Sequence, residues 1–163
     1  MTIAEYNSEK WHRRFFELAK LVAGWSKDPS SQTSAVIVDN MHRVVSLGYN
    51  GFARGVDDNP ERYESRAVKY EIIVHAEVNA IMNAGGRDLT GTSIYVYPYP
   101  PCSRCASQII QAGIKHVYVM DGEIPERWKE NLTLAETILN EAGVSIEKIK
   151  TEKPVKQPEI FSI

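Results

Sequence analysis

Hydrophobic side chains at helical spacing mark the first part of the chain. Between residues 8 and 25, the apolar positions that fall on one helical face are Trp11, Phe15, Leu18, Ala19 and Val22. This spacing is typical of an amphipathic helix, and the Ser8 hydroxyl is suited to cap its first turn. We therefore predict a helix over 8–25 whose apolar face packs on the rest of the protein.

Short aliphatic runs replace the helical pattern after a polar stretch. Ala35–Val38 and Val44–Leu47 flank an Asp39-Asn40 turn, and this arrangement predicts a β-hairpin. Residues 50–64 then contain two glycines, two aspartates and a proline, so we expect a loop there. A loop of this length in a compact domain is often functional.

Helical and strand-like segments alternate in the remainder of the chain. We predict helices at 76–83, 102–112 and 132–141, each followed closely by glycine, and strands at 93–97, 115–120 and 144–149. Alternation of this kind favours parallel strands joined by right-handed crossovers. The sequence therefore predicts an α/β fold: a three-layer α-β-α sandwich around a mixed five-stranded sheet.

The composition is that of one ordinary globular domain. The chain has 163 residues, of which 43% are apolar, so it can bury a core without a disulfide scaffold. We expect residues 1–150 to form a single domain and residues 151–163 to form an extended tail. No apolar run approaches the roughly 20 residues of a membrane span, and the first ten residues do not resemble a secretory signal. We therefore expect a cytoplasmic protein without a membrane partner, in which both cysteines are reduced.

The charge balance bears on the kind of partner. The chain carries 19 basic and 21 acidic residues, whereas proteins that hold long nucleic acids usually have a basic excess that neutralises phosphates. A small-molecule substrate is therefore expected, and a long nucleic acid is not.

Two short segments carry the residues best suited to chemistry: 74–80, which reads VHAEVNA, and 100–106, which reads PPCSRCA. Each stands where a helix is expected to begin. Cys102 and Cys105 are three residues apart at such a start, so both thiols lie on one face. With His75 as a third ligand they would form a zinc site with one open position, which is typical of catalytic zinc. Glu77 is then the candidate general base.

Together, H-x-E and P-C-x-x-C in this order are the signature of zinc-dependent deaminases. The first motif alone is weak, and a C-x-x-C pair at a helix start also occurs in redox modules. A redox or metal-binding module leaves His75 and Glu77 unexplained, so we keep it as a remote alternative. Asn50 precedes Gly51 in a strong turn signal, and its amide could also bind a sugar hydroxyl or a base edge.

The sequence resembles the CMP/dCMP deaminase family and, within it, the deoxycytidylate deaminases. The resemblance covers roughly residues 11–143 and lies in four blocks: SKDPSSQTSAVIV, GYNGFARGV, KYEIIVHAEVNAI and IIQAGIKHVYV. It implies a cytidine deaminase-like fold and hydrolysis of dCMP to dUMP and ammonia, which supplies dUMP for dTMP synthesis. A deaminase of another cytosine, guanine or adenine nucleotide, or of tRNA, is the alternative.

The resemblance also implies roles for particular residues. His75, Cys102 and Cys105 would bind Zn²⁺, Glu77 would shuttle protons, and Asn50 and the Ala76 backbone would contact the substrate. The substrate phosphate requires cations, for which the candidates are Arg54, Arg104 and Arg127. Relatives are often homo-oligomers regulated by dCTP and dTTP, so an oligomer is expected and both nucleotides are possible effectors. Many relatives also carry a second, structural zinc site, which two cysteines do not suffice to build here.

Overall fold

The computed structural model describes residues 2–150, without the side chains of residues 3–7. The predicted tail, 151–163, lies outside the described residues. The elements are α1 (Ile3–Ala23), β1 (Ser34–Val38), β2 (Val44–Tyr49), β3 (Gly51–Phe52), α2 (Pro60–Glu64), α3 (Arg66–Ile72), β4 (Ile73–Val74), α4 (Ala76–Asn83), β5 (Ser93–Tyr97), α5 (Ser103–Gln111), β6 (His116–Met120), the 3₁₀ turn η1 (Glu126–Trp128), α6 (Lys129–Glu141) and β7 (Ser145–Ile149).

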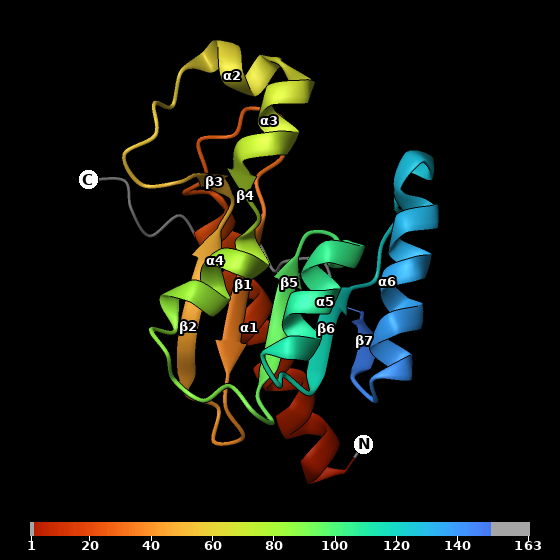
Figure 1. Ribbon diagram of the computed structural model, residues 1–163. Helices are drawn as coiled ribbons and strands as arrows, with labels where there is room; N and C mark the ends of the chain where they lie inside the picture. The colour runs from red at the N-terminus through yellow and green to blue at the C-terminus, as the bar shows by residue number, and fades with distance from the viewer. Residues whose placement is uncertain (1, 151–163) are drawn as a thin grey trace, which may run out of the picture.

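A mixed five-stranded sheet with the order β2-β1-β5-β6-β7 forms the centre. β1 is antiparallel to both β2 and β5, whereas β5, β6 and β7 are parallel to one another. Helix α1 covers one face of this sheet, and α4, α5 and α6 cover the other (Figure 1). The predicted hairpin, the parallel pairing of the three later strands and the three-layer architecture are therefore confirmed.

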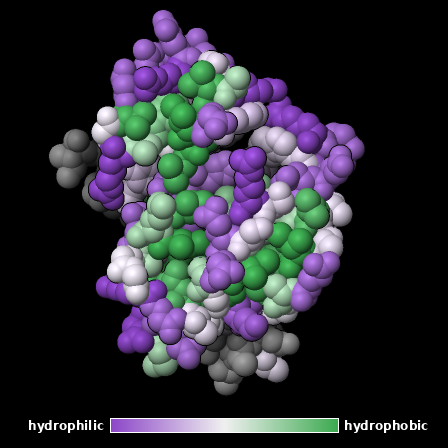
Figure 2. All heavy atoms as spheres, viewed as in Figure 1, coloured by the Kyte–Doolittle hydropathy of each residue, from purple (hydrophilic) through white to green (hydrophobic). Residues whose placement is uncertain are grey.

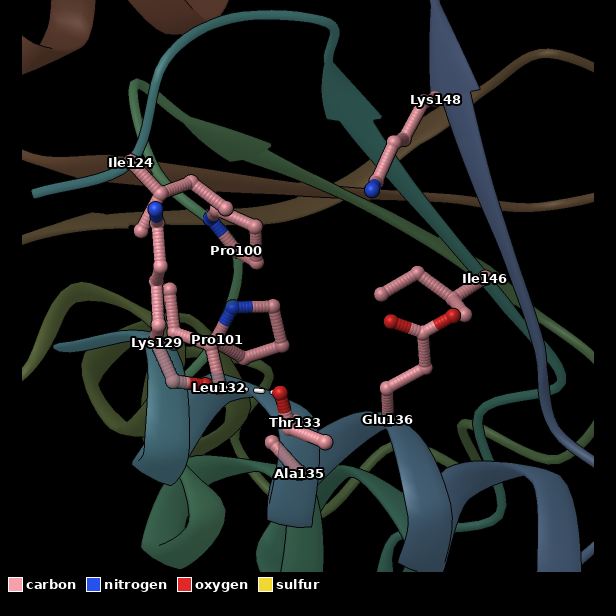
Figure 3. A pocket seen from close by; sticks show the side chains of 10 residues that line it. All are labelled: Pro100, Pro101, Ile124, Lys129, Leu132, Thr133, Ala135, Glu136, Ile146 and Lys148. Carbon is pink, nitrogen blue, oxygen red and sulfur yellow. Dashed lines mark hydrogen bonds between the residues drawn. The ribbon is translucent and has the colours of Figure 1, made fainter. Parts of the chain in front are cut away.

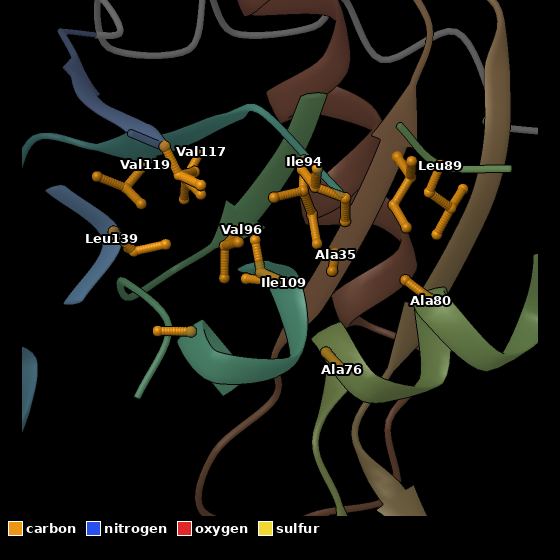
Figure 4. Close-up of a cluster of buried hydrophobic side chains, with 14 of the residues drawn as sticks. Ala35, Ala76, Ala80, Leu89, Ile94, Val96, Ile109, Val117, Val119 and Leu139 are labelled. Carbon is orange, nitrogen blue, oxygen red and sulfur yellow. The ribbon is translucent and has the colours of Figure 1, made fainter. Parts of the chain in front are cut away.

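Apolar side chains fill the space on both faces of the sheet. The five residues of β1 are all buried, because successive side chains of a strand point to opposite faces and both faces are covered here. Ala35 and Ile37 belong to the core beneath α4, α5 and α6 (Figure 4). Val36 and Val38 pack with residues of α1, which include Phe15. The sheet is thus fixed from both sides, and its end is a rigid base for the functional side chains.

The segment 50–64 is not the plain loop that we predicted. It contains β3 and α2, and α3 and β4 follow, so that 51–74 forms an excursion from the main sheet (Figure 1). Gly51 pairs with Val74 and Phe52 with Ile73, and a partner so distant in the chain leaves no local pattern. α2 has a local signal in the sequence, an N-cap residue followed by proline: the Asn59 side chain accepts a hydrogen bond from the Glu61 N–H at 2.8 Å.

Two helices begin earlier than their patterns indicated. α1 begins at Ile3 and not at Ser8, and the Ser8 hydroxyl contacts the His12 Nε2 atom at 3.1 Å instead of capping the helix. α6 begins at Lys129 and not at Leu132. None of the helices within residues 2–150 is long and apolar enough to cross a membrane.

Gly48 allows α4 to lie directly against β2. A Cβ atom at this position would lie 2.4 Å from the Ala80 nitrogen and 2.6 Å from the Ala76 oxygen, and backbone atoms of a packed helix cannot move aside. We expect Gly48→Ala to lower the free energy of unfolding by about 3 kcal/mol, as measured by urea denaturation. Gly122→Ala is the matched control, because nothing lies within 4 Å of its added methyl group. Equal midpoints for the two variants would contradict the close approach.

Candidate metal centre

Two helix N-termini meet at the end of the sheet from which the 51–74 excursion projects (Figure 1). His75 is the N-cap residue of α4, directly after β4, and Cys102 is the N-cap residue of α5, a few residues after β5. Both have extended backbones and neither side chain caps its own helix. The imidazole and the thiol are therefore available to another ligand, beside the positive ends of two helix dipoles.

His75, Cys102 and Cys105 each direct one potential ligand atom into the same small volume. All these atoms lie within 4.8 Å of one another, and His75 Nδ1 is 3.6 Å from Cys102 Sγ and 3.3 Å from Cys105 Sγ. Ligand atoms around tetrahedral zinc are about 3.6 Å apart, given Zn–S and Zn–N bonds of about 2.3 and 2.1 Å. The three residues therefore fit Zn²⁺, with a fourth position left for water or substrate. Within residues 2–150 they are the one group of this kind.

The thiols and the imidazole influence one another strongly. Hydrogen bonding from the Cys105 thiol, and then from His75, lowers the pKa of Cys102 to about 4. The Cys102 sulfur and burial raise the pKa of Cys105, and the hydrogen bond with Cys102 raises that of His75. The contacts of Cys102 with Cys105 and His75 therefore favour its thiolate form. A divalent cation displaces the remaining protons, because its ligands bind as thiolates and neutral imidazole.

Glu77 lies beside the three ligands without belonging to their group. It is the second residue of α4 and only 7% exposed. Burial raises the pKa of its carboxyl, which also interacts with Cys105. Burial disfavours the charged form of a carboxyl, so Glu77 holds a proton more readily than an exposed glutamate does. This environment suits a proton carrier.

Asn50 is buried, and its amide is engaged within the protein. Its Oδ1 accepts a hydrogen bond from the Thr33 N–H at 2.9 Å, and its Nδ2 donates to the Ser31 carbonyl at 2.7 Å and to Asp28 Oδ2 at 3.3 Å. The predicted turn at Asn50-Gly51 is not formed, because Asn50 joins β2 directly to β3, which begins at Gly51. One lone pair of Asn50 Oδ1 is left for a substrate. Contact with a substrate stays a prediction.

The three arginines proposed for phosphate lie in different places. Arg54 is exposed in the turn after β3, and Arg104 is exposed in the first turn of α5. The charge of Arg104 acts on His75, which places it near the metal centre. Arg127 is exposed, with its guanidinium 4.9 Å from the centre of the Trp128 ring. Their phosphate contacts stay predictions.

Asn131 is a residue of the site that the sequence patterns did not indicate. Its Oδ1 accepts a hydrogen bond from the Ser103 N–H at 3.0 Å, and its Nδ2 donates to the Ser103 hydroxyl at 3.0 Å. α6 thus holds the first residue of α5, next to Cys102. A partner 28 residues away leaves no motif.

Two cavities lie near these elements, and the three ligands line neither. One, of about 180 Å³, lies between α6, β7 and the segment before Cys102 (Figure 3). The other, of about 610 Å³, lies between the end of α1, residues 28–32 and Tyr97. The metal centre instead opens to solvent at His75, which is exposed, whereas Cys105 is buried. A substrate can therefore approach the ligands from the His75 side.

Three metal ligands with an open fourth position lie beside a buried carboxyl, at the end of an α/β sheet where two helices begin. This combination of fold and site defines a class of protein, the zinc-dependent deaminases. The chain belongs to the family described as the cytidine and deoxycytidylate deaminase zinc-binding region, whose model matches residues 9–121. The predicted family and its zinc cofactor are thereby confirmed.

Known proteins similar to this chain agree with that membership. An uncharacterised deaminase from the luxG 3' region of Aliivibrio fischeri is 44% identical over 139 residues, which cover 84% of this chain and 92% of that protein. A deoxycytidylate deaminase of Homo sapiens is 40% identical over 144 residues, or 85% of this chain and 79% of that protein. The crystal structure of the apo dCMP deaminase from cyanophage S-TIM5 has a TM-score of 0.67 at 23% identity, covering 86% and 98% of the two chains. This last likeness bears out the predicted fold.

Proposed function

We propose that this protein hydrolyses the amino group of dCMP to give dUMP and ammonia. The observation that carries the proposal is the placement of the buried Glu77 carboxyl beside the His75, Cys102 and Cys105 ligands. The similarity of this chain, over 85% of its length, to a human deoxycytidylate deaminase supports dCMP as the substrate. Residues 1–150 would then form one deaminase domain.

His75, Cys102 and Cys105 would hold a zinc ion, which would supply Lewis acidity: it would lower the pKa of a water and so provide the nucleophile for the ring carbon C4 that carries the amino group. Glu77 accepts the proton that the water loses and delivers it to ring N3. The same carboxylate then takes the second proton of the former water and transfers it to the departing amino nitrogen. The sum is one water consumed and one ammonia released, with Glu77 returned to its first state.

The residues suited to orient the substrate lie in the first turn of α4, at Asn50 and in the first turn of α5. Backbone groups at the start of a helix lack intrahelical partners, so the Ala76 backbone is suited to bind a polar edge of the base. The free lone pair of Asn50 Oδ1 is suited to accept a hydrogen bond from a sugar hydroxyl. Arg104, near the metal centre, is the best placed of the three arginines to attract the phosphate.

A substrate panel tests the proposal. We expect the zinc-loaded protein to turn over dCMP with a kcat/KM about 100-fold above that for deoxycytidine, because phosphate recognition adds charge-assisted contacts. The panel also holds dCTP, cytosine, guanine and a tRNA anticodon stem-loop, and ammonia release is measured for each. Preferred turnover of an unphosphorylated compound, or of the stem-loop, would contradict the assignment to dCMP.

Self-association, regulation and compartment remain parts of the proposal. Apolar side chains are visible among polar ones on the face that carries α4, α5 and α6 (Figure 2), and Met82 and Leu134 on these helices are 69% and 53% exposed. Such side chains support the expected homo-oligomer. We place the protein in the cytoplasm, where reducing conditions would keep both cysteines available to the metal. The nucleotides to test as regulatory effectors are dCTP and dTTP.

A further inference from the structure

A buried ion pair joins α3 to the polar loop before β1. Lys69 Nζ lies 2.7 Å from Asp28 Oδ2 and 2.9 Å from Asp28 Oδ1, and it donates to the Ser30 hydroxyl at 2.8 Å. Lys69 is 8% exposed and Asp28 only 1%. Charged side chains are rarely so buried unless they are paired, and neither of these two has a part in the proton transfers.

The Asp28 carboxylate of this pair is also hydrogen-bonded to the Asn50 amide. Asp28 Oδ2 accepts a hydrogen bond from Asn50 Nδ2 at 3.3 Å, while Asp28 Oδ1 accepts from the Ser30 and Ser31 N–H groups at 2.9 and 3.2 Å. Asn50 in turn donates to the Ser31 carbonyl at 2.7 Å. The orientation of the amide therefore depends on a loop that is itself folded around the Asp28 carboxylate.

Lys69 also stands at a particular place along the chain. It lies in α3, which runs through the two residues of β4 into His75, and β4 pairs with β3, which directly follows Asn50. The ammonium therefore connects the excursion that ends at a metal ligand with the loop that holds a candidate substrate contact. Without it, Asp28 would be a buried carboxylate with no cation beside it within the described residues, and the loop would rearrange to hydrate it.

We propose that Lys69 is a positioning residue for nucleotide binding: through Asp28 it holds the Asn50 amide in the orientation that meets the substrate. The proposal rests on the function proposed above. It predicts a defect in KM and not in the chemical step, because Lys69 is linked to Asn50 and not to Glu77.

The Lys69→Met variant, of similar length but without charge, tests this. We expect its KM for dCMP to rise about tenfold while kcat stays within about threefold of the original protein. Lys69→Arg should restore KM to within about threefold, because it replaces the cation. Asp28→Asn combined with Lys69→Met should fold without a buried unpaired charge and keep the raised KM, which separates positioning from loss of stability.

A double-mutant cycle with Asn50→Ala tests the route of the effect. If Lys69 acts through Asn50, the Asn50→Ala and Lys69→Met double variant should have a KM within about twofold of Asn50→Ala alone. Multiplied effects would overturn the proposal, as would a Lys69→Met variant with an unchanged KM. If the panel reveals another nucleotide as substrate, the function proposed above fails, and the same KM ratios measured with that nucleotide still decide on Lys69.

Arg43→Met is the matched control. Arg43 Nε lies 2.7 Å from Asp39 Oδ2, the same separation as in the Lys69 pair, but the Arg43 side chain is 74% exposed. This pair lies in the turn between β1 and β2, and exposed pairs contribute little to stability. We expect its KM and kcat to stay within about twofold of the original values. A KM rise equal to that of Lys69→Met would overturn the positioning role.

Discussion

Replacing Glu77 by glutamine should lower kcat for dCMP by about 10⁴-fold while zinc stays bound at about one ion per chain. The reaction needs two successive proton transfers, and glutamine can neither accept the first proton nor release it to N3. The carboxyl is buried and has a raised pKa, so bulk water does not readily take its place. The amide has nearly the same volume, and the loss should therefore be one of chemistry and not of folding.

Steady-state kinetics, metal analysis and thermal unfolding of the same preparation decide this prediction. Glu130→Gln is the matched control, because Glu130 is exposed in the first turn of α6, and its kcat should remain within about twofold of the original value. Loss of zinc from Glu77→Gln would instead make Glu77 a metal ligand. A kcat near that of the original protein would remove it from the proton transfers.

The candidate centre could be read from the sequence because its parts are local. His75 and Glu77 are two residues apart, Cys102 and Cys105 three, and each pair stands at the beginning of a helix that hydrophobic periodicity and glycines already indicated. A helix N-terminus fixes where these side chains point. The supports of the centre could not be read in the same way. The contacts of Asn131 with Ser103 and of Lys69 with Asp28 join residues 28 and 41 positions apart.

The difference between local patterns and contacts of distant residues also explains which parts of the fold could be predicted. The run Ala35–Val38 indicated a strand because it is covered on both faces, and the alternation after residue 93 indicated parallel pairing. The segment 50–64 was interpreted as a loop because β3, its one strand, has only two residues, as has its partner β4 at 73–74. Such strands exist through their pairing with each other, which follows from the tertiary structure and not from local propensity.

Cys105→Ser should abolish zinc binding and, with it, deamination. Cys105 is 1% exposed and its sulfur lies 3.3 Å from His75 Nδ1, so it is the most enclosed of the three ligands. A serine hydroxyl is not deprotonated at neutral pH and is a poor zinc ligand, which leaves only two of the three protein ligands. We expect the zinc content to fall from about one ion per chain to about one tenth of that. The unfolding temperature should fall as well, because the bound ion stabilises the folded state.

The decisive measurement compares reconstitution after chelation. The original protein, stripped of metal, should regain its activity and its unfolding temperature when zinc is returned, whereas Cys105→Ser should regain neither. Ser107→Ala, on the exposed side of α5, should behave as the original protein does and excludes a general effect of altering this helix. Full zinc content in Cys105→Ser would contradict its role as a ligand. Deamination by the stripped original protein would contradict the metal's part in the reaction, because Glu77 alone offers no positive charge to activate the water.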